Sequence, residues 1–237
     1  MEAIQAWALA FWEQFKFNLI DGDRYKMLLS GLGVTIEIAL AAAVIGVVLG
    51  CIIALMRLSN VRFLGWYWLR GIAQVYVDVI RGTPIVVQLM IMYYIILATF
   101  TGSKVLVAIL AFGLNSAAYV SEMVRGGILS VDKGQTEAGR SLGLSSSATL
   151  MEIVMPQAIK NILPSLFNEF IMLLKETSVA GYIALMDLAK AGDYIRSRTF
   201  SAYFPLLTVA AIYLVMVLGL SRIFGHVERR MRQGDHR

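Results

Sequence analysis

The chain has 237 residues, of which 58% are hydrophobic and only 16% are charged, and its formal net charge is +5. A soluble domain carries roughly 25% charged residues, and one of this size could not keep so much apolar surface away from water. The composition therefore excludes a soluble enzyme, a disordered chain and, with a single cysteine, a disulfide scaffold. It predicts an integral membrane protein.

The first 26 residues predict an amphipathic segment ahead of the membrane domain. Trp7, Phe11, Trp12 and Phe15 recur at helical spacing, so their rings gather on one side of a helix. Such a helix either lies in the membrane interface or packs against the helical bundle, and the pattern fits both arrangements. Residues 27–237 are predicted to form one transmembrane domain.

Five apolar stretches follow, and a helix needs roughly 20 residues to cross the hydrocarbon core. Glu37 is the only charge in the first stretch, where Gly46 and Gly50 favour close packing against a neighbouring helix. The sequence predicts an all-α membrane protein with five transmembrane helices. The stretches are Leu28–Met56, Trp66–Phe100, Val105–Val124, Ala158 to about Tyr182, and Tyr203–Phe224.

The second stretch is too long for one straight helix, because it would rise about 50 Å against ~30 Å of hydrocarbon. The segment Arg81-Gly82-Thr83-Pro84 supplies a break. Thr83 is a good N-cap, and Pro84 fits the first position of a helix. We therefore expect a shallow helix over about 63–80 and a short crossing helix over about 84–97.

The distribution of lysine and arginine predicts the orientation of the chain. These residues are more frequent in the segments that lie inside when the N-terminus is outside, which favours an external N-terminus and a cytoplasmic C-terminus. The loop over residues 125–156 is then cytoplasmic. A basic cluster directly after the last span is typical of membrane anchoring rather than nucleic-acid binding; it consists of Arg229, Arg230, Arg232 and Arg237.

The cytoplasmic loop predicts two short helices. Residues 136–143 can form the first, and Gly143 can end it. Ser145 and the serines after it offer N-cap hydroxyls for the second helix. Leu142 and Leu144 lie in the turn between the two, where apolar side chains are candidates for insertion into a partner's groove.

The spacing of this loop is distinctive. Glu137-Ala138-Gly139 is followed after three residues by Gly143, and after nine more by Ile153-Val154-Met155-Pro156. This spacing resembles the signature loop of permease subunits in binding-protein-dependent ABC importers, with mild departures at Gly139 and Met155. Other segments resemble the polar amino acid branch of that family: Arg81-Gly82-Thr83-Pro84 with Gln88, Asn115-Ser116-Ala117-Ala118-Tyr119, and Lys175-Glu176-Thr177-Ser178.

The resemblance implies the type I ABC importer permease fold, a place in the bacterial inner membrane, and transport rather than catalysis. It also implies four kinds of partner: a pair of ATPase subunits, a second permease subunit that is identical or homologous, an extracytoplasmic solute-binding protein, and a polar amino acid. Because the chain lacks a phosphate-binding loop motif, we expect ATP and Mg²⁺ on the ATPase subunits and no cofactor or metal on this chain. The residues implied to dock on the ATPase are Glu137, Ala138, Gly139, Arg140, Ser141, Leu142, Gly143 and Leu144.

Several polar residues are expected at membrane depth, where a charge costs about 2.5–3.5 kcal/mol and so needs a reason. Asn115 and Glu169 lie about 13–15 Å along their helices, near the midplane. An amino acid would suit them, because its ammonium seeks a carboxylate and amide oxygens. The candidate substrate-binding residues are Asn115, Ser116, Tyr119, Ser165, Asn168, Glu169, Met172, Arg81 and Gln88.

Structural roles compete with these assignments. Glu122 and Arg125, three residues apart, fit an ion pair near the interface. Arg81 can assist a substrate carboxylate at the helix start, or it can pair with Asp78 and only staple the turn. Glu169 can line a cavity or serve packing alone.

Two other functions also compete with the importer. An ion-coupled secondary amino acid transporter could use Glu169 as its titrating group, although it would be expected to show an internal repeat and no docking loop. A scaffold or channel subunit would have no substrate site. The substrate is not readable within its class, because every amino acid carries an ammonium while Arg81 and Lys175 leave room for acidic side chains.

Overall fold

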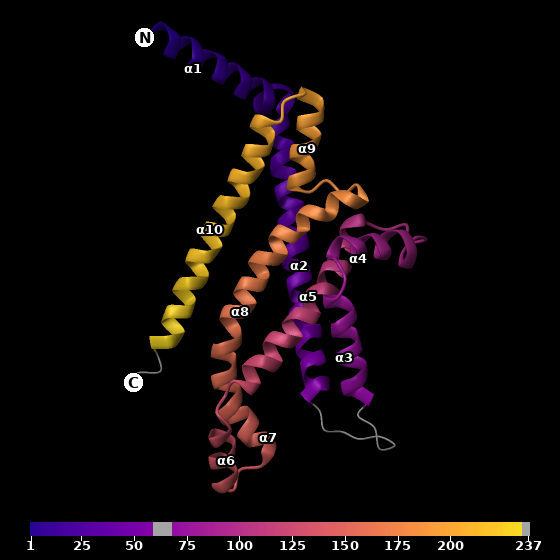
Figure 1. Cartoon of the computed structure of the whole chain (residues 1–237), viewed down its shortest axis with the longest axis vertical. Coiled ribbons are helices and arrows are strands. Elements are labelled where there is room, and N and C mark those ends of the chain that lie inside the picture. The colour runs from indigo at the N-terminus through magenta and orange to yellow at the C-terminus, as the bar shows by residue number, and fades with distance from the viewer. Residues whose placement is uncertain (59–67, 234–237) are drawn as a thin grey trace.

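The computed structural model describes residues 1–58 and 68–233, and its regular elements in these ranges are all helical. Figure 1 shows an elongated bundle with α9 near one end and α6 and α7 at the other. The α-helices are α1 (Glu2–Phe15), α2 (Arg24–Leu58), α3 (Trp68–Arg81), α4 (Ile85–Ile91), α5 (Lys104–Leu129), α6 (Lys133–Ser141), α7 (Ser146–Ala148), α8 (Met155–Glu176), α9 (Leu188–Thr199) and α10 (Tyr203–Gln233).

Three stretches of the described chain are long and apolar enough to cross a membrane: the one that ends with α2, then α5 and α10. A fourth is added if α3 and the helical stretch 85–96 are counted as one bent span. Helix α8 has 22 residues, which is long enough, but it is too polar to be counted on composition. The fourth predicted stretch consists of α8 and the 3₁₀ turns of Thr177–Ile183.

The break in the second predicted stretch is confirmed, because α3 and the stretch 85–96 meet at an angle of 107°. The predicted cap is wrong. Pro84 is itself the N-cap of α4, with an extended ψ of 138°, while Thr83 Oγ1 donates a hydrogen bond back to the Val79 carbonyl at 2.9 Å. The helical region is disfavoured for a residue before proline, so Thr83 lies between the two helices and, instead of starting α4, bonds back to α3 through its hydroxyl. Residues 63–67 of the predicted shallow helix lie outside the described residues.

Helices α2 and α5 form the centre of the bundle and approach closely through glycines. A Cβ atom at Gly46 would lie 2.7 Å from Ser116 Oγ, and one at Gly50 would lie 2.6 Å from Val120 Cβ. Contacts this short leave no room for a side chain, so the predicted packing role of both glycines is confirmed. On the same bundle, Ile38 of α2, Phe112 of α5 and Leu173 of α8 belong to one buried apolar cluster.

The α9 end is held by a buried carboxylate that caps a helix. Asp187 accepts hydrogen bonds from the amides of Ala189 and Lys190, both at 3.0 Å, as an N-cap residue does. The Leu188 amide donates to Thr35 Oγ1 at 3.1 Å, which ties the start of α9 to α2. Gly31 permits this contact, since a Cβ atom there would lie 2.7 Å from the Asp187 carbonyl oxygen.

The N-terminal helix α1 projects away from the bundle (Figure 1). Its Phe11 and Phe15 make edge contacts with Phe204 of α10, at 5.0 and 6.1 Å between ring centroids. Trp7 and Trp12 are exposed. The predicted packing against the bundle is therefore seen at Phe11 and Phe15, and the predicted place of α1 in the membrane interface stays a prediction.

Candidate functional site

A buried carboxylate lies where α2, α5 and α8 meet. Glu169 is 9% exposed, and its Oε1 accepts a hydrogen bond of 2.8 Å from the hydroxyl of Ser116, which is 1% exposed. Gly46 of α2 leaves the space that Ser116 occupies. Within the described residues this hydrogen bond is the polar contact of Glu169, and no ion pair neutralises it. The site therefore retains acceptor capacity for a cation.

Asn115, the neighbour of Ser116, points to a different element. Its Nδ2 donates to Gln88 Oε1 of α4 at 2.9 Å. Gln88 Nε2 in turn donates to the Ile80 carbonyl and to Thr83 Oγ1, both at 2.7 Å. Adjacent residues on a helix are turned by about 100° from one another, so α5 presents Ser116 to α8 and Asn115 to the break between α3 and α4.

Further along α5, Tyr119 and Glu122 continue the face that begins with Asn115. The guanidinium of Arg81 lies over the Tyr119 ring, with Cζ 5.5 Å from its centroid, and Nη1 is 3.5 Å from Glu122 Oε1. Of the two roles considered for Arg81, the pairing with Asp78 is not found within the described residues. Asp78 accepts a hydrogen bond from Gln74 at 2.8 Å, one turn back on α3, and Arg81 is drawn to α5 instead.

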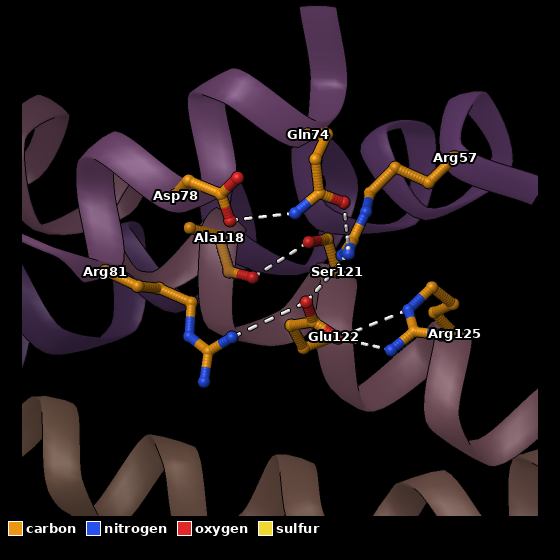
Figure 2. A network of polar contacts seen from close by, with 8 residues as sticks. All are labelled: Arg57, Gln74, Asp78, Arg81, Ala118, Ser121, Glu122 and Arg125. Carbon is orange, nitrogen blue, oxygen red and sulfur yellow. Dashed lines mark hydrogen bonds and ion pairs between the residues drawn. The ribbon is translucent and has the colours of Figure 1, made fainter. Parts of the chain in front are cut away.

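Figure 2 shows Glu122 at the centre of a polar network. The predicted ion pair with Arg125 is confirmed at 2.9 Å, and Arg57 from the end of α2 adds a second at 2.8 Å. Sequence reasoning missed Arg57, because it lies at the end of an apolar stretch where an arginine is ordinarily taken as an interfacial anchor. Its side chain is in fact only 6% exposed.

The remaining candidate residues of α8 are not brought to Glu169 within this chain. Ser165 lines a cavity of about 740 Å³ together with Lys160, Asn161 and residues of α5. Asn168 and Met172 are exposed, the latter by 51%. Asn168 and Met172 therefore lie on an open face of α8 rather than in a closed pocket with Glu169.

The predicted docking loop forms a compact tip at the far end of the bundle (Figure 1). Helix α6 starts three residues earlier than predicted, with Asp132 as its N-cap, and ends before Gly143, which has a φ of +87°. Arg140 Nη1 donates to the Leu144 carbonyl at 2.6 Å, so the turn is fixed. The Ser145 hydroxyl caps α7 as predicted. Leu142 is 83% exposed.

Further contacts hold the residues of the tip together as one rigid unit. Ser141 Oγ donates to the Glu137 carbonyl at 2.8 Å on α6. Gly139 is buried, and a Cβ atom there would lie 2.7 Å from Ile153 Cδ1 and 2.9 Å from Thr149 Cγ2. Gly139, which stands where the family usually has alanine, therefore allows close contact with the helical turns of Thr149–Val154. Ala138 is exposed.

Comparison with known proteins relates this geometry to a family. The model of the family described as "Binding-protein-dependent transport system inner membrane component" matches residues 46–233. The chain belongs to this family. It is a multi-pass permease component of a bacterial inner membrane, and a transporter of this kind works with an ATPase and a binding protein. Membership favours the importer over an ion-coupled secondary transporter.

Individual relatives agree with the family assignment. The chain is 39% identical over 210 residues to the arginine transport system permease protein ArtQ of Bacillus subtilis, covering 88% of this chain and 94% of the relative. It is 35% identical over 209 residues to the glutamine transport system permease protein GlnP of Escherichia coli, covering 87% and 93%.

A solved structure described as an amino acid ABC transporter with histidines shares the fold, with a TM-score of 0.80 and 40% sequence identity. The match covers 87% of this chain and 94% of the other. The α5 and α8 helices that hold Ser116 and Glu169 lie within the family match. The buried polar site is therefore part of the shared transport domain rather than an addition to it.

Proposed function

We propose that the chain is a permease subunit of an ATP-driven importer that takes up a polar amino acid by alternating access. The names of the relatives support this substrate class, since they refer to arginine, glutamine and histidine. The proposal includes five spans, formed by α2, α3 with the stretch 85–96, α5, α8 and α10, with the N-terminus outside. Helix α8 is then the polar span, as suits the wall of a transport path.

The observation that carries the proposal is the Glu169 carboxylate, 9% exposed and bonded in the described chain to one neutral hydroxyl. A buried charge without a counter-charge is unfavourable. A substrate ammonium beside it would supply that counter-charge, while Asn115 and Gln88 would offer amide groups from the neighbouring side of α5. We assign Ser116 the role of orienting the carboxylate.

The exposed face of α8 would meet a second permease subunit, identical or homologous, across the transport path. Ser165, Asn168 and Met172 lie on or beside that face, so they would reach the substrate only in the assembled pair. Tyr119 and Arg81 would line the part of the path nearer the α6–α7 tip. The extracytoplasmic binding protein would dock at the opposite end, near α9.

The α6–α7 tip would dock on a pair of ATPase subunits in the cytoplasm. Leu142 is its most exposed apolar side chain, and its rigid turn would pass the closure of the ATPase to α5 and α8, which flank the tip in the chain. ATP and Mg²⁺ would be bound by the ATPase subunits, and this chain would bind no cofactor.

Replacing the buried carboxylate tests the substrate site. Glu169→Gln should lower uptake by about tenfold or more, because a charge-assisted hydrogen bond to the substrate is lost. It should also abolish stimulation of the ATPase by substrate, while assembly and basal ATPase activity persist. Uptake and ATPase rates would be measured in proteoliposomes with saturating binding protein.

Glu176→Gln is the matched control, since Glu176 is a half-buried carboxylate two turns along the same helix. It should leave substrate stimulation of the ATPase close to the wild-type value. Asn115→Ala should weaken uptake less than Glu169→Gln, because it removes a neutral hydrogen bond worth about 0.5–1.5 kcal/mol. Wild-type uptake by Glu169→Gln contradicts the site, and loss of assembly would favour a purely structural role.

A further inference from the structure

Three arginines from three helices converge on one carboxylate (Figure 2). Glu122 Oε1 lies 2.8 Å from Nη2 of Arg57 and 3.5 Å from Nη1 of Arg81, and Oε2 lies 2.9 Å from Nη2 of Arg125. A carboxylate balances one of these charges. The other carboxylate in the network, Asp78, is bonded to Gln74 and forms no ion pair within the described residues.

The cluster also contains a buried donor without a partner. Arg57 is 8% exposed, and within the described residues its Nη2 donates to Gln74 Oε1 at 2.8 Å and forms the ion pair with Glu122. Its Nη1 is buried and has no hydrogen-bond partner in the described part of the chain. An orphaned donor on a buried cation is costly, so the cluster has both spare charge and spare hydrogen-bonding capacity for a second anion.

Arg81 is the guanidinium best able to receive that anion. It makes the longest of the three ion pairs, and its side chain is 45% exposed, against 6% for Arg57. It also lies over Tyr119, which is one helical turn from Asn115 of the candidate substrate site. The cluster thus continues the α5 face that begins with Asn115, about 10 Å further toward the α6–α7 tip.

We propose that Arg57, Arg81 and Arg125 form a subsite for a carboxylate, and that its ligand is the α-carboxylate of the amino acid as it leaves the Glu169 site for the cytoplasm. The inference rests on the proposed function and deepens it. Guanidinium forks match carboxylates in a bidentate geometry, and Glu122 holds the three forks together between transport events. Glu169 would take the ammonium, and the arginine cluster would next take the carboxylate.

A cysteine beside Arg81 reports the local charge. Tyr119→Cys in a Cys51→Ser background places a single thiol under the guanidinium, in the complete complex with its ATPase and binding protein in proteoliposomes. The thiol is treated with methanethiosulfonates that carry either an anionic sulfonate or a cationic trimethylammonium. The rate of each reagent is divided by its rate with a free thiol in solution. After this correction, the anionic reagent should react about fivefold faster than the cationic one. Adding Arg81→Gln should reduce this preference, and Arg81→Lys should restore it.

Protection of the same thiol identifies the ligand. L-arginine, L-histidine and L-glutamine are each compared with their α-amides, which keep the ammonium and lose the carboxylate charge. At least one amino acid should slow labelling, and its α-amide should not. The experiment is run in neutral phosphatidylcholine and again with added phosphatidylglycerol, so that a lipid phosphate is distinguished from the amino acid.

Equal reactivity toward both reagents overturns the inference, because the cluster would then hold no spare positive potential. A second outcome also overturns the substrate assignment: phosphatidylglycerol removes the preference for the anionic reagent, and none of the amino acids slows labelling. The cluster would then be a site for a lipid phosphate. The proposed function can fail separately. Wild-type uptake by Glu169→Gln would remove the Glu169 site, whereas the anion preference and the carboxylate-dependent protection belong to the arginine cluster alone.

Discussion

Gly46 and Gly50 let α2 and α5 pack closely, and Gly46 leaves room on α2 for Ser116, which donates to Glu169 of α8. Their roles could be predicted from spacing alone, since small residues four apart are typical of packed membrane helices. The partner of each polar residue could not. Asn115 and Ser116 are neighbours in the chain, yet they bond to Gln88 on α4 and Glu169 on α8, because which helix faces each side of α5 depends on the tertiary arrangement.

Gly50→Ala should destabilise the protein by about 1–3 kcal/mol, as overpacking of a core does. The added Cβ would lie 2.6 Å from Val120 Cβ and 3.0 Å from the Ala117 carbonyl oxygen, so α2 and α5 would have to separate. Gly33→Ala is the matched control on the same helix, where nothing lies within 4 Å of the added atom. The measurement is thermal unfolding in detergent, followed by the loss of monodisperse complex. Equal midpoints for the two variants would contradict the packing argument.

Among the elements, the break between α3 and α4 was predictable because glycine and proline interrupt helices by known mechanisms. The direction taken by Arg81 was not, since Asp78 on its own helix and Glu122 on α5 are equally plausible partners in the sequence. The helical tip was predicted more closely. Its hydrogen bonds are local, such as those of Ser145 and Arg140, so the residues near them in the chain largely decide its shape.

Gly143→Val should uncouple ATP hydrolysis from uptake. A β-branched residue at a φ of +87° is strained, at about 1–2 kcal/mol, and relief of that strain would move Leu142 relative to α6. Gly143→Asn is the control, because asparagine tolerates this region of backbone conformation. Uptake per ATP hydrolysed, measured in proteoliposomes, should fall for the valine variant and remain near wild type for the asparagine variant. An unchanged ratio for both would show that the turn does not transmit the motion.

Cross-linking tests which end of the bundle meets the ATPase. Leu142→Cys in a Cys51→Ser background should form a cross-link with the ATPase subunits, because this side chain is 83% exposed at the tip. Ser197→Cys on α9, at the opposite end, should form none. The product would be detected as a shifted band under non-reducing conditions. A cross-link from Ser197→Cys alone would invert the proposed arrangement.

For the whole molecule, composition predicted a membrane protein, and the loop spacing predicted the family that the comparison confirms. The number of spans is harder to predict, because α8 has the length of a span but a polar face. That face and the buried Glu169 are what a transport path requires and what a hydropathy count penalises. The polar residues that lower the hydropathy of α8, and so hide it from a count of spans, are therefore the same residues that favour α8 as the wall of the transport path.

Measuring which energy source drives uptake tests the central claim most directly. Proteoliposomes containing this chain with its ATPase would be given binding protein and radiolabelled polar amino acids outside, with ATP and Mg²⁺ either enclosed or absent, and with ionophores added to collapse ion gradients. The account predicts accumulation that requires enclosed ATP and external binding protein and that persists with ionophores present. Accumulation driven by an imposed ion gradient without ATP would contradict it.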